Sequence, residues 1–600
     1  MSNLRLLFMV CVVLGLGSLV RAEVRGTWLT TTGPDHIASG ANTASVFGTL
    51  RNTAKLNTVY VESWKNGYTQ FPSATMEALI GVDRRPQLGG NRNLLEETTI
   101  QAHRHQMAHV AWFEYGFSSE FVGAFGTPVN PLSQWAMSNG YLLEDRFGNY
   151  GNSSNGFAWM NPAVPEVRQL LIDITLEAIE QNDLDGVQLD DRLAWPREFG
   201  WDATTAALYQ AETGRSLPSN VNDSHFRQWR AAKVFAFATE WYTAVKTARP
   251  DLIVSVSPSI MTFSFTQYNA NWENWADAGL FDEIVPQVYR NSLSSYRSTL
   301  PTQVNIMAGA DRTADGRLED LVVGIARDVS SGATATSDLL AMIQDARDAG
   351  SAGHVLWYSR GVLEVADELG AFYAQNPELA ESPKLTAGRR PAPIVAGLTT
   401  PLPDVWTFTV ETEGQYRLVV REGSAWWELS SDYYLAGDYE LPLGLEIAQV
   451  ELLADRRPMA ADFDGDWVVG QSDIDALAGR FGTVNAAFDL DGSGLIDGDD
   501  LVWLVEQVWG TRMGDANRDG AVDLIDLSIL AERFGGSGVW ADGDFNGSRT
   551  VDLADLSVLA TSFGFDRVNG LAVPSPGLGG LMLMGLLGYT GGRSARSSAG

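Results

Sequence analysis

Short apolar runs alternate with amphipathic stretches from Val24 to about Gln375. The short runs predict buried β-strands, whereas 165–181 and 226–249 repeat their apolar residues with the period of a helix. The expected strands lie at 24–30, 58–64, 108–114, 186–191, 252–257, 283–288, 304–308 and 354–358. This alternation predicts an α/β fold, a (β/α)8 TIM barrel over residues 23–376. An open doubly wound sheet is the alternative, disfavoured because no glycine-rich phosphate loop follows the first strand.

The pattern changes after the predicted barrel. Residues 377–403 are rich in proline and small residues, which is typical of a linker. Residues 404–456 contain short runs of alternating apolar and polar positions. That alternation predicts a small β-sandwich-like domain.

Both ends of the chain resemble targeting segments. Arg5 precedes an apolar run to Leu19 and small residues follow, so residues 1–22 are predicted to be a signal peptide. Cys11, the only cysteine, lies inside it, which excludes disulfides and cysteine-ligated zinc from the mature chain. Residues 573–600 combine Pro-Ser-Pro, an apolar stretch and a basic end, and resemble PEP-type sorting signals with Ser575 in place of glutamate. We expect a secreted protein associated with the cell envelope.

The charge of the chain is strongly acidic and unevenly distributed. A net charge of −32 argues against nucleic acid as a partner, because phosphate binding requires clustered Lys and Arg. Between Asp462 and Asp555, 20 Asp and Glu residues face 5 Arg residues. Such a local excess requires either a bound cation or open solvent.

Four loops in this acidic segment share one spacing. The loop from Asp515 to Asp526 has oxygen-bearing side chains at positions 1, 3, 5, 9 and 12, and Gly520 at position 6. This is the calcium-loop template, in which glycine permits the sharp turn and carboxylates supply hard oxygen ligands to Ca²⁺. A merely solvated acidic tail is the alternative, but it would not repeat in phase. The expected ligands are Asp462, Asp464, Asp466, Asp473, Asp489, Asp491, Ser493, Asp497, Asp500, Asp515, Asn517, Asp519, Asp523, Asp526, Asp544, Asn546, Ser548, Asp552 and Asp555.

Position 12 of each loop is Asp, and a short apolar helix is expected after it, which resembles type I dockerin repeats. Four loops predict two dockerin-like modules, 460–511 and 512–566. In the first and last loops Trp467 and Arg549 replace the expected glycine, so weaker calcium binding is expected there. The resemblance implies a cohesin-bearing protein as a candidate partner.

The helices predicted after the four loops each carry an apolar pair spaced three residues apart. These pairs are Ile474 and Leu477, Leu501 and Leu504, Leu527 and Leu530, and Leu556 and Leu559. Because such pairs lie on one helix face, we expect the repeats to pack on one another as a calcium-stiffened spacer between barrel and envelope. Binding to a cohesin remains the alternative.

A family resemblance is visible in the predicted barrel. The motifs that carry it include Trp112-Phe113-Glu114-Tyr115, Asp185-Gly186-Val187-Gln188-Leu189-Asp190-Asp191 and Pro286-Gln287-Val288-Tyr289. In their order and spacing they resemble the glycosyl-hydrolase-like family 10, which includes bacterial enzymes acting on peptide-free peptidoglycan glycan strands. The resemblance covers about residues 23 to 375 and implies a barrel that hydrolyses glycosides.

Candidate catalytic carboxyl groups end two of the predicted strands, where barrel enzymes place their chemistry. Glycosidic cleavage needs an acid and a nucleophile or base. Strand alternation puts Asp190 on the face of Gln188, so we expect Asp190 to face the substrate as nucleophile or base and Asp191 to support loops or hold Arg192. Glu114 is the expected acid, because burial beside Trp112 would raise its pKa. Glu62 is the alternative second acid, and a helix cap is the alternative role for Asp190 and Asp191.

Other polar and aromatic residues at the expected strand ends are candidates for binding sugar hydroxyls and ring faces. They are Trp112, Asn161, Gln188, Gln287, Tyr289, Trp357 and Tyr358. Apart from His103, His105 and His109, the histidines lack metal-ligand spacing on a shared helix face, and that group is expected to be solvated, so no catalytic metal is expected. The leading hypothesis is a glycoside hydrolase acting on a bacterial or environmental polysaccharide. The alternative is a non-catalytic polysaccharide-binding or scaffold protein of the envelope.

Overall fold

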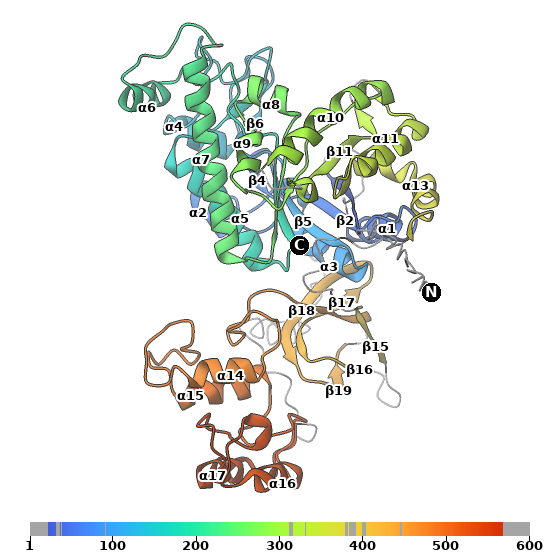
Figure 1. The fold of residues 1–600 in the computed structure, drawn as a ribbon, viewed down its shortest axis with the longest axis vertical. Coiled ribbons are helices and arrows are strands. Elements are labelled where there is room, and N and C mark those ends of the chain that lie inside the picture. Colours follow the sequence, from blue (N-terminus) through green and yellow to red (C-terminus); the bar gives the residue numbers. More distant parts are fainter. Residues whose placement is uncertain are drawn as a thin grey trace, which may run out of the picture.

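The computed structural model describes residues 22–31, 37, 39–89, 92–310, 316–329, 332–377, 382, 390, 392–398, 404–444 and 447–567. The predicted signal peptide, apart from its last residue, and the predicted sorting segment 573–600 lie outside the described residues. Within the described ranges, no helix combines the length and apolar character needed to span a bilayer. Figure 1 shows the barrel, a β domain and the acidic repeats following one another along the longest axis of the molecule.

Eight parallel strands form the N-terminal domain. Their order in the sheet is β10-β9-β8-β5-β2-β1-β14-β11, and bridges from Ile284 to Leu321 and from Gln287 to Gly324 join the two outer strands. The nearly closed sheet fits the predicted (β/α)8 barrel. The strands are β1 (Val24–Leu29), β2 (Thr58–Glu62), β5 (Ala108–Phe113), β8 (Gly186–Asp190), β9 (Ile253–Ser257), β10 (Glu283–Ile284), β11 (Val322–Ala326) and β14 (Gly353–Trp357).

Helices surround this sheet on its outer side (Figure 1). Local sequence explains where several of them begin: the Asn93 side chain accepts the Glu96 N–H, and Pro165 occupies a first-turn position that needs no donor. The main helices are α1 (Gly40–Asn52), α3 (Leu94–Arg104), α5 (Pro165–Gln181), α7 (Ser224–Ala248), α10 (Leu293–Gly309), α11 (Thr336–Asp348) and α13 (Ala366–Tyr373).

One predicted strand is wrong. Residues 304–308 belong to α10, in which Tyr296, Leu300, Gln303 and Met307 form the buried face with helical spacing. The seventh strand is instead β11, which is completely buried. A short apolar run fits a buried helix segment as well as a strand, which explains the error.

The interior of the barrel contains polar cross-links beneath the strand ends. The Trp28 indole N–H donates to Gln188 Oε1 at 2.7 Å, and Gln188 Nε2 donates to Ser255 Oγ at 2.8 Å. The Tyr60 hydroxyl donates to Glu283 Oε2 at 2.8 Å. These bonds join β1, β8 and β9, and β2 to β10, so the interior is a packed core rather than a channel.

The β domain consists of two antiparallel halves, β18-β17-β20-β15 and β15-β16-β19, which share β15. Phe408, Leu418, Tyr434 and Val450 are among the residues of its core. The predicted linker needs a correction, because its residues 394–398 form β15. The strands are β15 (Ile394–Leu398), β16 (Val405–Val410), β17 (Gly414–Glu422), β18 (Ala425–Tyr434), β19 (Gly437–Pro442) and β20 (Ile447–Ala454).

A buried ion network joins the β domain to the barrel at the N-terminal end of β8. Arg390 contacts Asp183 at 2.5 Å and Asp185 at 3.0 Å, and Arg417 of β17 donates to His103 Nδ1. His103 Nε2 lies 2.9 Å from Asp185. Burial alone would raise the pKa values of Asp183 and Asp185, but Arg390 and His103 together, with Arg417 added at Asp183, outweigh it and hold both below their ordinary values. The prediction that these histidines are solvated is therefore wrong for His103, and it is also wrong for His109, which is fully buried.

A second contact lies on the outer face of α3. The Arg104 guanidinium stacks 3.6 Å from the Trp426 ring centroid and pairs with Glu451 at 2.8 Å. Trp426 also packs with Ile100, so this tryptophan joins two domains. Barrel and β domain are consequently held together by both apolar and ionic contacts.

The acidic repeats form the C-terminal part of the described chain. Their helices are α14 (Gln471–Ala478), α15 (Gly498–Trp503), α16 (Leu524–Arg533) and α17 (Leu553–Ser562). Leu477, Leu504, Leu530 and Leu559 belong to one apolar cluster that also includes Tyr433 of the β domain. The packing of repeats on one another, predicted from the leucine spacing, is present in this cluster.

We expect Asp183→Asn to lower the free energy of unfolding by about 3 kcal/mol, because it leaves Arg390 buried without its full counter-charge. Denaturant unfolding of the full chain, followed by tryptophan fluorescence, measures this change. Asp345→Asn, which removes a partner of the exposed Arg297, is the matched control and should have little effect. Equal effects of the two substitutions would contradict the structural role of the network.

Candidate active site and acidic loops

Three carboxyl groups converge on one guanidinium at the C-terminal ends of β5 and β8. Glu114 follows β5, Asp190 is the last residue of β8 and Asp191 is next in the chain. Arg192 Nη1 lies 3.2 Å from Asp190, 3.6 Å from Asp191 and 3.8 Å from Glu114. The nearest oxygens of Glu114 and Asp190 are thus at most about 7 Å apart, so the two carboxyl groups are close enough to act on one bond.

Lys65, in β3 (Trp64–Lys65), extends this cluster toward β2. Its Nζ lies 2.5 Å from Glu62 and 2.9 Å from Glu114. Glu62 is fully buried and also accepts hydrogen bonds from Thr30, Thr31 and Gln70. With its oxygens fully engaged by the protein, Glu62 anchors Lys65 and is a poor second catalytic acid.

The electrostatic environment shifts the pKa values of these carboxyl groups in different directions. Burial would raise the pKa of Glu62, but Lys65 and the threonine hydroxyls outweigh it, so the pKa lies below its ordinary value. Burial raises the pKa of Glu114, with Glu62 adding to the effect. Burial, together with the charges of Asp191 and Glu114, raises the pKa of Asp190 well above its ordinary value.

The expected orientation of Asp191 needs a correction. Asp191 lies in a turn, so the alternation of β8 ends at Asp190. Its side chain is 25% exposed, contacts Arg192 and lies 3.5 Å from Ser259 Oγ. Asp191 therefore belongs to the same charged cluster as Asp190, while also contacting Arg192 as expected.

Aromatic side chains lie beside the acids over the barrel core. Tyr289 stacks on Trp357 with ring centroids 5.9 Å apart, and Trp112 meets Trp357 edge-on at the same distance. Tyr358 packs against Trp357 at 5.2 Å. The buried Trp112 Nε1 and Tyr289 Oη have no hydrogen-bond partner among the described residues. Two unused polar atoms among these rings are suited to a polar ligand such as a sugar.

The structure separates the remaining predicted binding residues from these rings. Asn161 is fully buried, donates to Thr205 and accepts the Ala163 N–H, so it holds a loop and is not a sugar ligand. Gln188 is likewise buried, as the cross-link between Trp28 and Ser255. Gln287 is partly exposed and donates to the Ser257 carbonyl. The amide groups of Asn161 and Gln188 are suited to binding sugar hydroxyls, but both side chains are buried and already bonded, so their roles are structural.

Sequence reasoning missed Lys65 as a member of the site. One signal was available: the chain has only five lysines against 37 arginines, and Lys65 is three residues after a glutamate at a predicted strand end. Its contact with Glu114 joins β3 to β5 and is not visible in local sequence. Trp28 packs against Trp112 with ring centroids 6.4 Å apart. The sequence shows it only as an apolar residue of the first strand, so its place beside these rings was not predicted.

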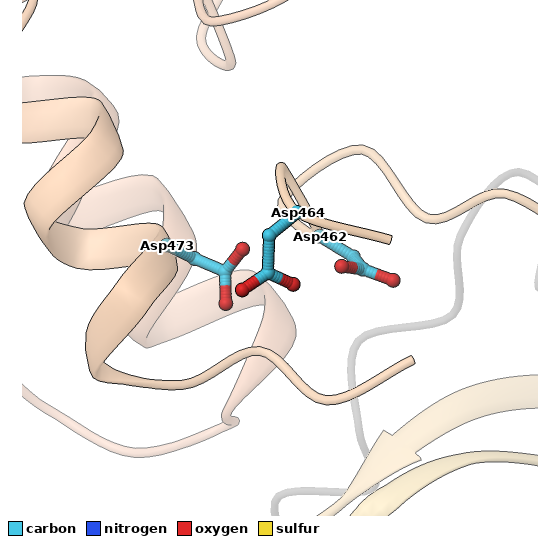
Figure 2. Close-up of side chains that lie close together, drawn as sticks. All are labelled: Asp462, Asp464 and Asp473. Carbon is cyan, nitrogen blue, oxygen red and sulfur yellow. The ribbon is translucent and has the colours of Figure 1, made fainter. Parts of the chain in front are cut away.

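The acidic loops gather carboxylates at two places. Figure 2 shows Asp462 and Asp464 on the first loop with Asp473 of α14, and their oxygens lie within 4.8 Å of one another. Asp489, Asp491 and Asp500 of the second loop are arranged in the same way. Asp489 Oδ1 is buried and has no hydrogen-bond partner within the described part of the chain. Oxygen-only donors and an unused acceptor fit a hard cation such as Ca²⁺.

All four loops have the same backbone turn. Position 6 is left-handed in each: Trp467 has φ 65°, Gly494 89°, Gly520 88° and Arg549 64°. The carboxylate at position 1 accepts the position 6 N–H, as in the bonds of Asp462 to Trp467 and of Asp544 to Arg549. Trp467 and Arg549 therefore keep the turn without glycine, at a conformational cost of about 1 kcal/mol each.

A (β/α)8 barrel with paired carboxyl groups and aromatic rings at its strand ends has the architecture of a carbohydrate-active barrel protein. The family model for glycosyl hydrolase-like 10 matches residues 23–331, and the chain belongs to this family. The predicted family resemblance is thereby confirmed.

Curated relatives include glycosyl hydrolase DigH of Escherichia coli strain K12 and of Shigella flexneri. Each is 23% identical over 255 residues, which cover 39% of this chain and 54% of the relative. The chain thus spans about half the length of the curated relatives it matches.

Solved structures with a similar fold match this chain with low TM-scores. The glycoside hydrolase domain of PgaB (BpsB) from Bordetella bronchiseptica is 14% identical with a TM-score of 0.41, covering 58% of this chain and 98% of that one. The catalytic domain of β-amylase from Paenibacillus polymyxa is 11% identical with a TM-score of 0.40, covering 59% and 98%. Family membership rests on the family model alone.

The raised pKa of Asp190 predicts a distinctive pH dependence. The fold favours the protonated acid, so its contribution to stability is full below the ordinary pKa of about 4 and is lost as pH rises through the raised value. Asp190→Asn, which mimics the neutral acid, should match the parent Tm near pH 4 and exceed it increasingly toward pH 8. Thermal unfolding across this range measures the difference.

Asp185→Asn is the control of opposite sign. The pKa of Asp185 is lowered, so its contribution is present above the ordinary pKa and is lost as pH falls toward the lowered value. This variant should be less stable than the parent at pH 7, with a deficit that shrinks in acid. The same pH trend in both variants would contradict the electrostatic difference between the two ends of β8.

Proposed function

We propose that the protein is a secreted glycoside hydrolase that cleaves O-glycosidic bonds of a polysaccharide. The observation that carries the proposal is the pair of buried carboxyl groups, Glu114 and Asp190, on either side of Arg192 at the strand ends. Family membership supports the same reaction class. Peptide-free peptidoglycan glycan strands are the first substrate to test, because the family resemblance implies them.

The charge balance of the site supports acid–base chemistry. Four carboxyl groups, those of Glu62, Glu114, Asp190 and Asp191, face three cations, Lys65, Arg85 and Arg192. One carboxyl group therefore lacks a counter-charge, and burial favours retention of a proton there. A site with one proton shared among coupled acids supplies both an acid and a base.

Burial raises the pKa of both carboxyl groups, that of Asp190 well above its ordinary value, so the pair holds a shared proton, which we assign to Glu114 during catalysis. The charge of Lys65 is shared with Glu62, which lies closer to it, whereas Asp190 has the shortest contact with Arg192 and accepts the Arg192 N–H at 2.9 Å. Glu114 would protonate the leaving oxygen as the glycosidic bond breaks. Asp190 would attack the anomeric carbon or take a proton from the attacking water.

We expect Asp190→Asn and Glu114→Gln each to reduce sugar release at least about 100-fold, because each removes one of the two proton-transfer or nucleophilic roles. Reducing-end assays on denuded peptidoglycan strands and on α- and β-glucans measure the loss. Asn161→Ala is the control, since its amide serves a loop, and should leave release per folded molecule unchanged.

The alternative function is a non-catalytic polysaccharide-binding or scaffold protein. It is favoured by the contacts of Glu114 and Asp190, each of which already has a cationic partner. Glycan binding without release from any of these polymers by the parent chain would support the alternative and contradict the hydrolase.

For the acidic repeats, we propose a calcium-stiffened spacer that links the barrel to the cell envelope. Bound Ca²⁺ would neutralise the clustered carboxylates of each loop and tie the loop to its helix. The shared core of the repeats supports packing on one another. A cohesin-bearing partner is the second candidate role, and calcium-dependent capture of one defined envelope protein by the full chain would favour it.

Removing calcium should lower the unfolding temperature of residues 462–565 and leave the barrel transition in place, because the expected calcium ligands lie only in the loops. Calorimetry with calcium and with chelator tests this, and identical profiles would exclude calcium-dependent folding. Asp515→Ala should weaken calcium binding more than Asp544→Ala, because position 6 is Gly520 in the loop of Asp515 and Arg549 in the loop of Asp544.

A further inference from the structure

An arc of aromatic rings runs along one side of the acid cluster. It begins at Phe121 of β6 (Ser118–Phe121), continues through Phe157 and Trp159 of β7 (Phe157–Trp159), and ends at Tyr268 and Phe263 of α8 (Met261–Tyr268). Successive ring centroids are 5.0, 6.5, 6.0 and 5.6 Å apart. The arc is therefore one continuous set of ring contacts built from three elements.

The arc contacts the surroundings of the acids at two points. The Arg192 guanidinium, which pairs with Asp190, lies 4.7 Å from the centroid of the Phe157 ring. At the other point, the Trp195 N–H, in the loop after β8, donates to the Tyr268 carbonyl at 2.8 Å. Burial, and then the negative charge of Asp191, raise the pKa of the Tyr268 hydroxyl, as its position beside the acids requires.

Both ends of the arc are exposed, whereas its middle is packed. Phe121 is 60% exposed and Phe263 is 47% exposed, while Trp159 is buried. Single exposed apolar side chains are common in proteins, but here two of them end one ring system that passes the acids. An extended ligand that crosses the acids could cover both rings.

The backbone holds the Phe121 ring in its exposed position. The Phe121 N–H donates to Asn66 Oδ1 at 3.1 Å, and the Val122 and Gly123 N–H groups both donate to the Gly156 carbonyl. A Cβ at position 156 would lie 3.0 Å from the Phe121 ring, so glycine there leaves the ring room to lie across the hairpin. A preformed ring loses little conformational freedom when a ligand stacks on it.

We propose that Phe121 and Phe263, the two exposed ends of the arc beside the acids, are stacking sites for sugar rings of one polysaccharide chain. The inference rests on the proposed function, because the acids define where the chain crosses. Pyranose rings present apolar C–H faces that pack on aromatic rings, while their hydroxyl groups remain available to polar groups such as Trp112 Nε1. The ligand is a glycan chain rather than a single sugar, because the proposal places one sugar on each exposed ring and another at the acids.

The test measures binding separately from cleavage. The full chain carrying Asp190→Asn is run in gels containing denuded peptidoglycan strands, soluble poly-N-acetylglucosamine or a soluble β-glucan. Adding Phe121→Ala or Phe263→Ala should weaken retention by at least one polymer about fivefold to tenfold, whereas Phe121→Tyr should retain binding because the ring remains. Phe563→Ala, in the tail, removes a ring that is also 47% exposed and should change nothing.

The outcomes distinguish this inference from the proposed hydrolase. Unchanged retention of both alanine variants, or no retention of the Asp190→Asn chain by any polymer, overturns the stacking sites even if the unmodified chain releases sugar. Loss of retention in both alanine variants, without sugar release by the unmodified chain, supports the stacking sites and removes the hydrolase. Loss in the Phe563→Ala control as well would show a general effect of apolar surface and would also overturn the inference.

Discussion

The architecture depends on the two-residue alternation of β8 and on the charged groups that flank the strand. Below the strand, Asp183 and Asp185 hold the β domain through Arg390. Within it, Gln188 points into the barrel and connects β1 to β9. Above it, Asp190 and Asp191 meet Glu114 at Arg192. A shift of one residue would turn Gln188 out of the core and remove Asp190 from the site, so one strand register determines domain docking, barrel packing and the acid pair together.

The two ends of β8 show that burial alone does not determine the charge state of an aspartate. Asp183 and Asp185 are buried against Arg390, with His103 and Arg417 beside them, and their pKa values fall. Asp190 is also buried, but other carboxyl groups are its neighbours and Arg192 is shared, so its pKa rises. Matched charges stabilise the domain junction, whereas unmatched charges leave the mouth of the barrel able to exchange a proton.

Local sequence predicted much of this, and the exceptions have physical causes. Seven strands, the loop spacing and the leucine faces follow from period and composition, which are local properties. The helical run at 304–308 is short and apolar, so only its packing distinguishes it from a strand. Lys65 and Arg104 act through partners distant in sequence, Glu114 and Trp426, and no local pattern shows those contacts. Asn161 has the chemistry of a ligand, and only the three-dimensional structure shows that Thr205 already uses it.

The docking of the β domain also bears on how such a chain can be recombined during evolution. A barrel cut at residue 376 would expose Ile100 and leave Asp183, Asp185 and His103 without Arg390 and Arg417. The barrel is therefore not an independent module that can be exchanged alone. Residues 23–456 form the smallest unit in which the buried charges keep their partners. Tyr433 and Leu435 are the β-domain residues in the apolar core of the repeats, and Glu413 pairs with Arg518 beside them, so exchange of the tail for another module disturbs a smaller part of the inherited core.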